Sequence, residues 1–89
     1  MSSGREVTLR YFAWVREKVG LAEECVMLPA NVATVSDLKT WLAGRGANYA
    51  HAFERADVIR AAIDQTHAKP DVSLKGAREI AFFPPVTGG

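Results

Sequence analysis

One segment, residues 34–43, has the pattern of an amphipathic helix, and it limits what the rest of the chain can build. Its apolar residues recur at helical spacing and therefore share one face; they are Val35, Leu38, Trp41 and Leu42. Thr34 is placed to cap the first turn, and Asp37 stands three residues later, in a capping-box position. Gly44 and Gly46 mark the end of the helix. One apolar stripe of this kind needs a complementary apolar layer, such as the face of a sheet.

Four other segments are typical of β-strands, because their apolar residues alternate or form short runs between turn signals. They are residues 7–12, 24–28, 59–64 and 79–83. In the first of them, Val7, Leu9 and Tyr11 share one face. A short helical turn over residues 13–19, which Gly20 can end, follows this strand.

The order of these elements is strand, short helix, strand, long helix, strand, strand. It favours an α+β fold of the ubiquitin-like β-grasp kind, with a mixed sheet packed on one main helix. Residues 47–53 are ambiguous between a loop and a further helical turn. We expect residues 1–83 to form one domain and residues 84–89 to form an extended C-terminal tail.

Size and charge exclude several classes of function. A chain of 89 residues, 48% of them hydrophobic, supports one core and leaves little material to wall a deep pocket. Eleven basic against ten acidic side chains give a net charge of +1, which leaves no basic excess to neutralise nucleic-acid phosphates. We therefore expect no nucleic-acid partner.

No segment has the pattern of a membrane anchor or a secretory signal. The first residues are small and polar and lead into Arg5 and Glu6, so no apolar signal core is present. No uncharged apolar run approaches the roughly 20 residues that span a bilayer. We expect a cytoplasmic protein without a membrane partner.

Residues able to do chemistry are few and scattered. His51 and His67 do not have the spacing of a metal site, and the single cysteine, Cys25, excludes an internal disulfide. Because Cys25 lies in an apolar strand, we expect a buried, inert thiol. Trp14 and Trp41 are interpreted as packing residues. We expect no metal, no directly bound cofactor and no complete active site on this chain.

The last residues differ from an ordinary frayed end, because they carry no charged side chain and are stiffened by proline. Pro84 and Pro85 favour an extended course, and the β-branched Val86 and Thr87 prefer extended backbone. Gly88-Gly89 then offers the slimmest backbone available. From Pro84 onward the tail reaches about 20 Å when extended. It can enter a channel of another protein and present the α-carboxyl group of Gly89.

This ending, Phe82-Phe83-Pro84-Pro85-Val86-Thr87-Gly88-Gly89, resembles the C-terminal signature of the small subunits of molybdopterin synthase, which are ubiquitin-like sulfur carriers. The resemblance continues upstream in Arg10-Tyr11-Phe12-Ala13, in Val15-Arg16-Glu17 with Gly20, in Leu28-Pro29 and in Thr34-Val35-Ser36-Asp37-Leu38. Two positions depart from it. The usual Asp-Gly-Asp-Glu turn reads Gly76-Ala77-Arg78-Glu79, and the usual Asn-Gln pair reads Asp64-Gln65.

The resemblance implies the chemistry. An ATP-dependent enzyme adenylates Gly89, and sulfur then replaces one oxygen to give a C-terminal thiocarboxylate. The tail, from Pro84 and Pro85 through Val86, Thr87 and Gly88 to Gly89, inserts into the large subunit. There the thiocarboxylate donates sulfur to cyclic pyranopterin monophosphate for the dithiolene of molybdopterin. This makes the chain the sulfur-donating subunit of a two-subunit sulfurtransferase.

The resemblance also implies the partners, which are the large synthase subunit in a heterotetramer and the ATP-dependent adenylating and sulfur-transfer enzyme. Candidate contact residues for these partners are Phe83, Phe12, Arg78 and Lys75. One of Phe82 and Phe83 is expected in the core, because neighbouring residues of a strand face opposite sides.

Three other functions fit a small domain that ends in Gly-Gly. The chain could carry sulfur for thiazole or cysteine biosynthesis, or it could be a ubiquitin-like modifier that forms an isopeptide bond with lysine. It could also be an interaction module whose tail has no role. The fold alone does not decide among these functions. The Phe-Phe-Pro-Pro-Val-Thr run favours the molybdopterin branch.

Overall fold

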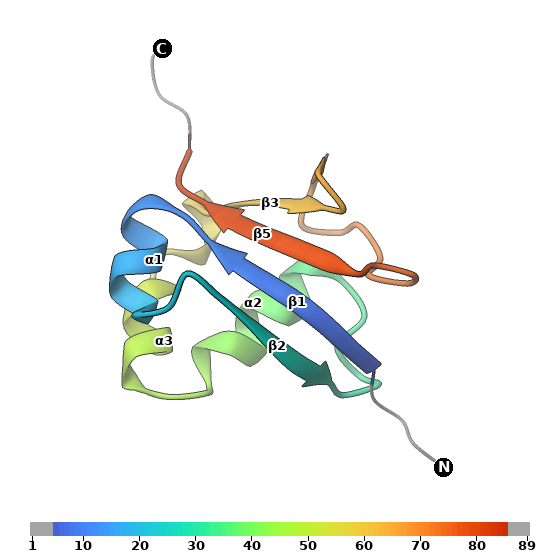
Figure 1. Cartoon of the computed structure of the whole chain (residues 1–89), viewed down its shortest axis with the longest axis horizontal. Helices are drawn as coiled ribbons and strands as arrows, with labels where there is room; N and C mark the ends of the chain where they lie inside the picture. Colours follow the sequence, from blue (N-terminus) through green and yellow to red (C-terminus); the bar gives the residue numbers. More distant parts are fainter. Residues whose placement is uncertain (1–4, 86–89) are drawn as a thin grey trace.

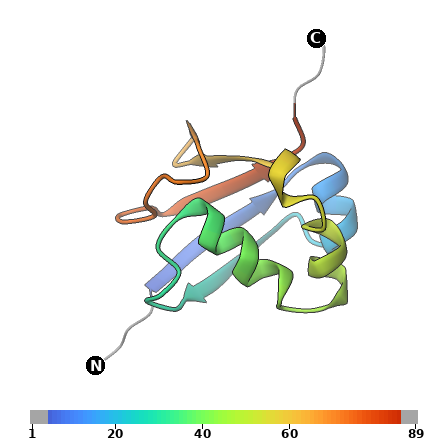
Figure 2. The same ribbon diagram turned by 180° about the vertical axis from the view of Figure 1, so that it is seen from behind.

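The computed structural model describes residues 5–85 and has the expected α+β architecture, a five-stranded mixed sheet with helices on one face (Figure 1). The strands are β1 (Arg5–Tyr11), β2 (Glu23–Leu28), β3 (Arg60–Ile63), β4 (Thr66–Ala68) and β5 (Glu79–Phe83). The helices are α1 (Ala13–Val19), α2 (Val35–Ala43), α3 (Ala47–Ala52) and the 3-10 turn η1 (Ala56–Val58). Seen from behind, α2 crosses the sheet diagonally (Figure 2).

The sheet has the strand order β2-β1-β5-β3-β4. The first and last strands lie side by side and parallel at its centre, with Thr8 beside Glu79 and Tyr11 beside Phe82. The other neighbours are antiparallel. Because β1 and β5 are parallel, Phe12, which follows β1, lies at the same end of the sheet as the last residues of β5.

The core fills the space between the sheet and the helices. The inward residues of β1, Val7, Leu9 and Tyr11, are buried, as the alternation predicts. On β5 the inward residues Ile80 and Phe82 are completely buried. The opposite face of the sheet carries no helix (Figure 1), so the outward side chains of these strands face solvent.

The helix α2 begins with the predicted capping box. The Asp37 N–H donates to Thr34 Oγ1 at 3.1 Å, and Asp37 Oδ2 accepts from the Thr34 N–H at 3.1 Å and the Ala33 N–H at 3.0 Å. These backbone donors hold the pKa of Asp37 below its usual value, because they stabilise the carboxylate. The helix ends at Ala43, before Gly44.

A buried lysine on α2 was not predicted. Lys39 Nζ donates to the carbonyl of Ala56 at 3.0 Å and to that of Ile59 at 2.6 Å. The ammonium group thereby joins α2 to η1, just before β3. Burial lowers the pKa of Lys39, and the positive charge of Arg60 lowers it further.

The prediction of four strands was incomplete, because β3 and β4 form a hairpin. Its turn residues, Asp64 and Gln65, have φ angles of 48° and 73°, as two-residue hairpin turns require. The strand β4 spans only three residues, of which only Ala68 is buried. Such a segment is too short for its alternation to be recognised. The ambiguous residues 47–53 mostly form α3.

The expectation of a buried Cys25 was wrong. Val26 and Leu28 occupy the inward positions of β2, so Cys25 and Met27 point outward and are exposed. The thiol lies 3.7 Å from Thr8 Oγ1 on the neighbouring strand. An apolar run of four residues predicts a strand buried on both faces, but β2 is an edge strand with one face in solvent.

Between Arg5 and Pro85, no helix is long and apolar enough to cross a membrane.

Candidate functional site

The end of β5 is held by a buried aromatic side chain. Phe82 is 0% exposed and stacks on Tyr11, with ring centroids 6.2 Å apart. The ring of Phe53 meets Phe82 edge-on at 5.3 Å. In the backbone, the Phe12 N–H donates to the Phe82 carbonyl at 3.0 Å. These contacts fix the position of the chain immediately before Pro84.

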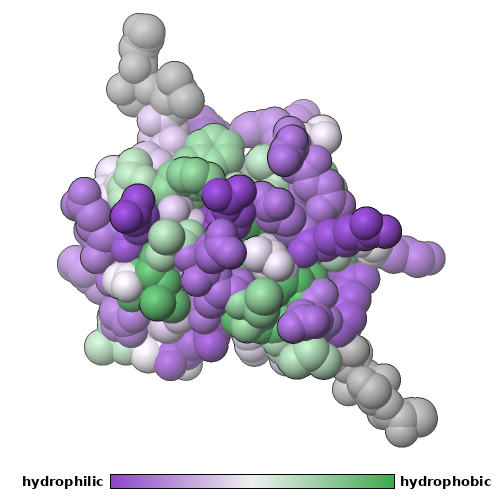
Figure 3. Space-filling model, in the orientation of Figure 1, coloured by the Kyte–Doolittle hydropathy of each residue, from purple (hydrophilic) through white to green (hydrophobic). Residues whose placement is uncertain are grey.

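Apolar residues surround the point where β5 ends, and we call Phe12, Phe83, Pro84 and Pro85 the exit patch. Phe12 is 42% exposed, and Phe83 and the two prolines are half-buried. Figure 3 shows apolar surface over this end of the sheet. Phe82 faces the core and Phe83 faces outward, so the prediction that they lie on opposite faces is confirmed.

Polar side chains border the exit patch. The Arg10 guanidinium lies 5.6 Å from the centroid of the Phe12 ring, a favourable cation–π distance. Arg10 also pairs with Glu23 at 3.6 Å and with Glu79 at 3.5 Å. The ring of His67 approaches Phe83 with centroids 6.3 Å apart. An apolar centre with a polar rim is the usual composition of a protein–protein contact.

The structure does not bring all the predicted contact residues together. Phe12 and Phe83 lie at one end of β5, whereas Lys75 and Arg78 come just before its start. Because a strand rises about 3.3 Å per residue, Arg78 and Phe83 lie about 16 Å apart along the sheet. Lys75 and Arg78 are both exposed. They belong to a different part of the surface from the exit patch.

The two departures from the expected sequence pattern meet at this second location. The Asp64 carboxylate accepts from the Arg78 N–H at 3.1 Å and from the Glu79 N–H at 2.9 Å. Gly76 has φ 79°, a left-handed conformation that favours glycine. The β3–β4 turn is thus hydrogen-bonded to the start of β5, and the turn glycine stands at position 76.

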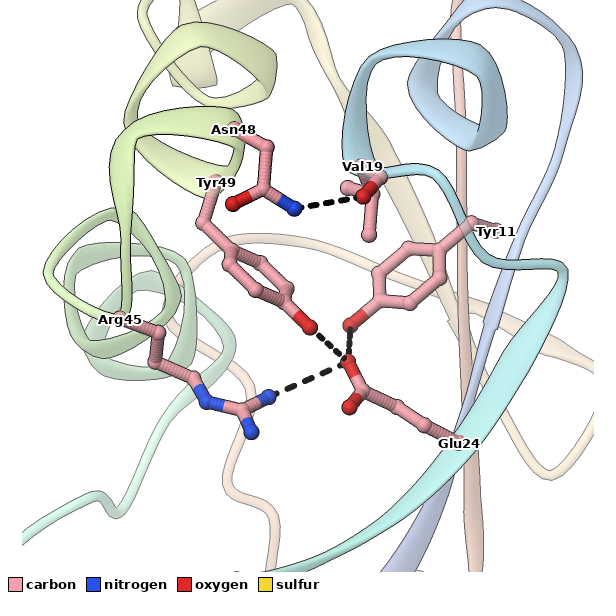
Figure 4. Close-up of polar contacts among 6 residues, drawn as sticks. All are labelled: Tyr11, Val19, Glu24, Arg45, Asn48 and Tyr49. Carbon is pink, nitrogen blue, oxygen red and sulfur yellow. Dashed lines mark hydrogen bonds and ion pairs between the residues drawn. The ribbon is translucent and has the colours of Figure 1, made fainter.

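A polar cluster supports the other end of the Tyr11 ring (Figure 4). Glu24 Oε2 accepts from Tyr11 Oη at 2.8 Å, from Tyr49 Oη at 2.8 Å and from Arg45 Nη1 at 3.1 Å. Arg45 also lies over the Tyr49 ring, 4.8 Å from its centroid. Beside the cluster, Asn48 Nδ2 donates to the Val19 carbonyl at 2.6 Å. The cluster joins β1, β2, α1 and α3.

This cluster was missed by reasoning from the sequence, although one signal was present. Alternate residues of a strand face the same side, so Glu24 faces the core together with Val26 and Leu28. A carboxylate there requires buried donors. Burial and the hydrogen bond to Glu24 raise the pKa of Tyr11, and the same causes raise that of Tyr49.

The substitution Glu24→Gln is expected to lower the free energy of unfolding by about 1–3 kcal/mol, because it removes the charge that the two buried tyrosine hydroxyls and Arg45 share. The measurement is urea-induced unfolding. Glu23→Gln is the matched control, since the Glu23 side chain is 60% exposed and its pair with Arg10 spans 3.6 Å. We expect it to cost less than about 1 kcal/mol. Equal losses in the two variants would contradict a special role for Glu24.

Four predicted site residues, Val86, Thr87, Gly88 and Gly89, lie outside the described residues. Pro84 and Pro85 are the last described positions, and they continue directly from β5. Within residues 5–85, no three His, Cys, Asp or Glu side chains are grouped so that they could hold a metal ion.

Comparisons with known proteins extend over almost the whole chain. The ThiS family matches residues 9–89. The molybdopterin synthase sulfur carrier subunit of Haemophilus influenzae is 38% identical over 79 residues, covering 89% of this chain and 94% of that protein. The subunit of the same name from Escherichia coli is 37% identical over 83 residues, covering 93% and 99%.

A solved structure agrees with the fold. The crystal structure of SAMP1 from Haloferax volcanii is 26% identical to this chain and has a TM-score of 0.69. It covers 96% of this chain, and the match covers 100% of that structure. The resemblance derived from the C-terminal signature is thereby confirmed: the chain belongs to the ThiS family.

Proposed function

We propose that this chain is the sulfur carrier of a molybdopterin synthase, with the transferable sulfur on Gly89. The observation that carries the proposal is the uncharged ending Pro84-Pro85-Val86-Thr87-Gly88-Gly89, attached directly to a central strand. The burial of Phe82 supports it, because a fixed base gives the tail a defined starting point. The names of the two bacterial relatives support the same assignment.

The chemistry begins with activation of a poor electrophile. The Gly89 carboxylate attacks the α-phosphate of ATP on a partner enzyme, giving an acyl-adenylate and releasing pyrophosphate. A sulfur donor at the oxidation level of sulfide then displaces AMP and leaves a thiocarboxylate. This sulfur attacks cyclic pyranopterin monophosphate in the large subunit. Two such transfers supply both sulfurs of the dithiolene.

The chain itself contributes positioning. A tethered nucleophile has a high effective concentration, and a stiff tail limits its direction of approach. The acid–base and phosphate-binding groups come from the large subunit, with two small and two large subunits in the assembly. No cofactor is bound directly to this chain, and ATP is used by the activating enzyme in the cytoplasm.

The exit patch is the proposed contact surface for both partners. Phe12 and Phe83 stand beside the base of the tail, so a protein that takes up the tail meets them first. Aromatic residues at the centre of an interface contribute most of its affinity. Lys75 and Arg78, at the start of β5, would be reached only by a partner that extends along the strand.

Mass spectrometry of the C-terminal peptide tests the proposal. After incubation with the activating enzyme, ATP and a sulfur donor, we expect a mass gain equal to the replacement of one oxygen by one sulfur. A reaction without ATP is the control and leaves the mass unchanged. An unmodified peptide under complete conditions would contradict the proposal.

A second candidate function is protein modification, in which Gly89 forms an isopeptide bond with a lysine. The structural likeness to SAMP1 favours considering it, since another solved structure that is 26% identical to this chain is described as H. volcanii small archaeal modifier protein 1. Conjugates of higher mass that carry a Gly-Gly remnant on lysine would support it. A carrier for thiazole or cysteine biosynthesis would accept sulfur but would not capture the large synthase subunit.

A further inference from the structure

The two edges of the sheet are built differently. At one edge, β4 is a strand of only three residues, as is usual where a protein prevents further pairing. At the other edge, β2 spans six residues and contains the uncharged run Cys25-Val26-Met27-Leu28. Met27 is 58% exposed. Figure 3 shows apolar surface over the same strand. Glu23 and Glu24 stand at the start of β2, and the four residues after them carry no charge or proline that would block strand addition.

The backbone of β2 has a regular set of outward groups. The Tyr11 N–H donates to the Ala22 carbonyl at 2.9 Å, and the register then alternates along the two strands. Glu24 and Val26 consequently direct their N–H and C=O groups toward β1. Glu23, Cys25 and Met27 direct theirs away from the sheet, where an added strand would bind.

Charged side chains on this edge are confined to its first two residues, Glu23 and Glu24. Glu23 pairs with Arg10 at 3.6 Å, and Glu24 pairs with Arg45 at 3.1 Å. Each carboxylate of β2 thus has a cationic partner in its own chain, and Glu23 shares its partner, Arg10, with Glu79. Because both carboxylates stand at the start of the strand, two copies of this edge can pair antiparallel without placing one carboxylate opposite another.

We propose that β2 pairs antiparallel with β2 of a second copy of this chain, about a two-fold axis at Cys25. In this register Cys25 stands opposite Cys25 of the second copy, and Glu23 stands opposite its Met27. All three outward residues then donate and accept hydrogen bonds, and no donor is needed from Pro29. The two sheets become continuous. Because β1 of the second copy runs in the opposite direction, the two exit patches lie at opposite ends of the dimer.

The register predicts opposite effects for two charges at one position. Met27→Glu places a carboxylate opposite Glu23 of the second copy, twice by symmetry, and is expected to raise the dimer dissociation constant about tenfold. Met27→Lys places an ammonium group there and is expected to lower it. Sedimentation equilibrium up to millimolar concentration, in a reducing buffer that excludes an intermolecular disulfide, measures both constants. Circular dichroism confirms that each variant is folded.

Val72→Glu is the matched control, since Val72 is exposed and apolar but lies away from β2; its dissociation constant should equal that of the wild type. Hydrogen exchange gives a second readout. The amides of Glu23, Cys25 and Met27 should gain protection as concentration rises, while those of Glu24 and Val26 should not change. A chain that stays monomeric, or equal weakening by Met27→Glu and Met27→Lys, would overturn the proposal.

Discussion

Gly88→Val is expected to leave the free energy of unfolding unchanged and to lower sulfur transfer by about 100-fold or more. All the buried apolar residues of the described core lie between Val7 and Phe82, so a side chain at position 88 removes none of their contacts. In the proposed mechanism, however, Gly88 must pass through a narrow channel in two partner enzymes. A β-branched side chain adds width there and restricts the backbone next to the reacting carbon.

The experiment compares product formation with thermal unfolding in the same variant. Thr87→Val is the matched control, because it introduces the same side chain one residue earlier, where a β-branched residue already stands. We expect it to retain most of the activity. Normal product formation by Gly88→Val would show that the channel argument is wrong, whatever the control does.

The features that were predicted correctly from the sequence depend on residues close together in the chain. The capping box needs only Thr34 and Asp37, three residues apart. The end of α1 needs only Gly20, which adopts φ 92°. The inward face of β1 follows from simple alternation. In each of these cases the physical cause lies within one turn or one strand, so it can be read without knowing the fold.

The features that were missed depend on contacts between distant segments. Glu24 accepts a hydrogen bond from Tyr49, which is 25 residues away. No local sequence pattern predicts that hydrogen bond. The exposure of Cys25 depends on which face of the sheet the helices cover. Strand order is set by the whole topology. For the same reason, the sequence did not show that Lys75 and Arg78 lie away from the exit patch. Their location follows from the direction of β5 in the sheet, which places them at the opposite end of that strand.

The parallel pairing of β1 with β5 explains why the base of the tail is so firmly held. A C-terminal strand at the edge of a sheet would be bonded on one side only and would fray readily. Here β5 is bonded to β1 on one side and to β3 on the other. We therefore expect β5 to stay paired with both neighbours when a partner binds the residues beyond Phe83.

Two adjacent residues at the base of the tail have different expected roles: Phe82 stabilises the fold, and Phe83 contacts the partner. Phe82→Ala is expected to lower the free energy of unfolding by about 3–5 kcal/mol, because the ring is completely buried against Tyr11 and Phe53. For a domain of this size, that loss lowers the Tm by at least about 12 °C. Thermal unfolding by circular dichroism measures it.

Phe83→Ala is the matched variant, with the opposite expected result. Its ring faces outward beside His67, so the stability loss should stay below about 1 kcal/mol. Binding to the large synthase subunit should weaken about 30-fold, as for the loss of an aromatic residue at the centre of an interface. Calorimetric titration measures that affinity. If Phe83→Ala binds as tightly as the wild type, the exit patch is not the contact surface, and a partner would have to recognise the tail alone.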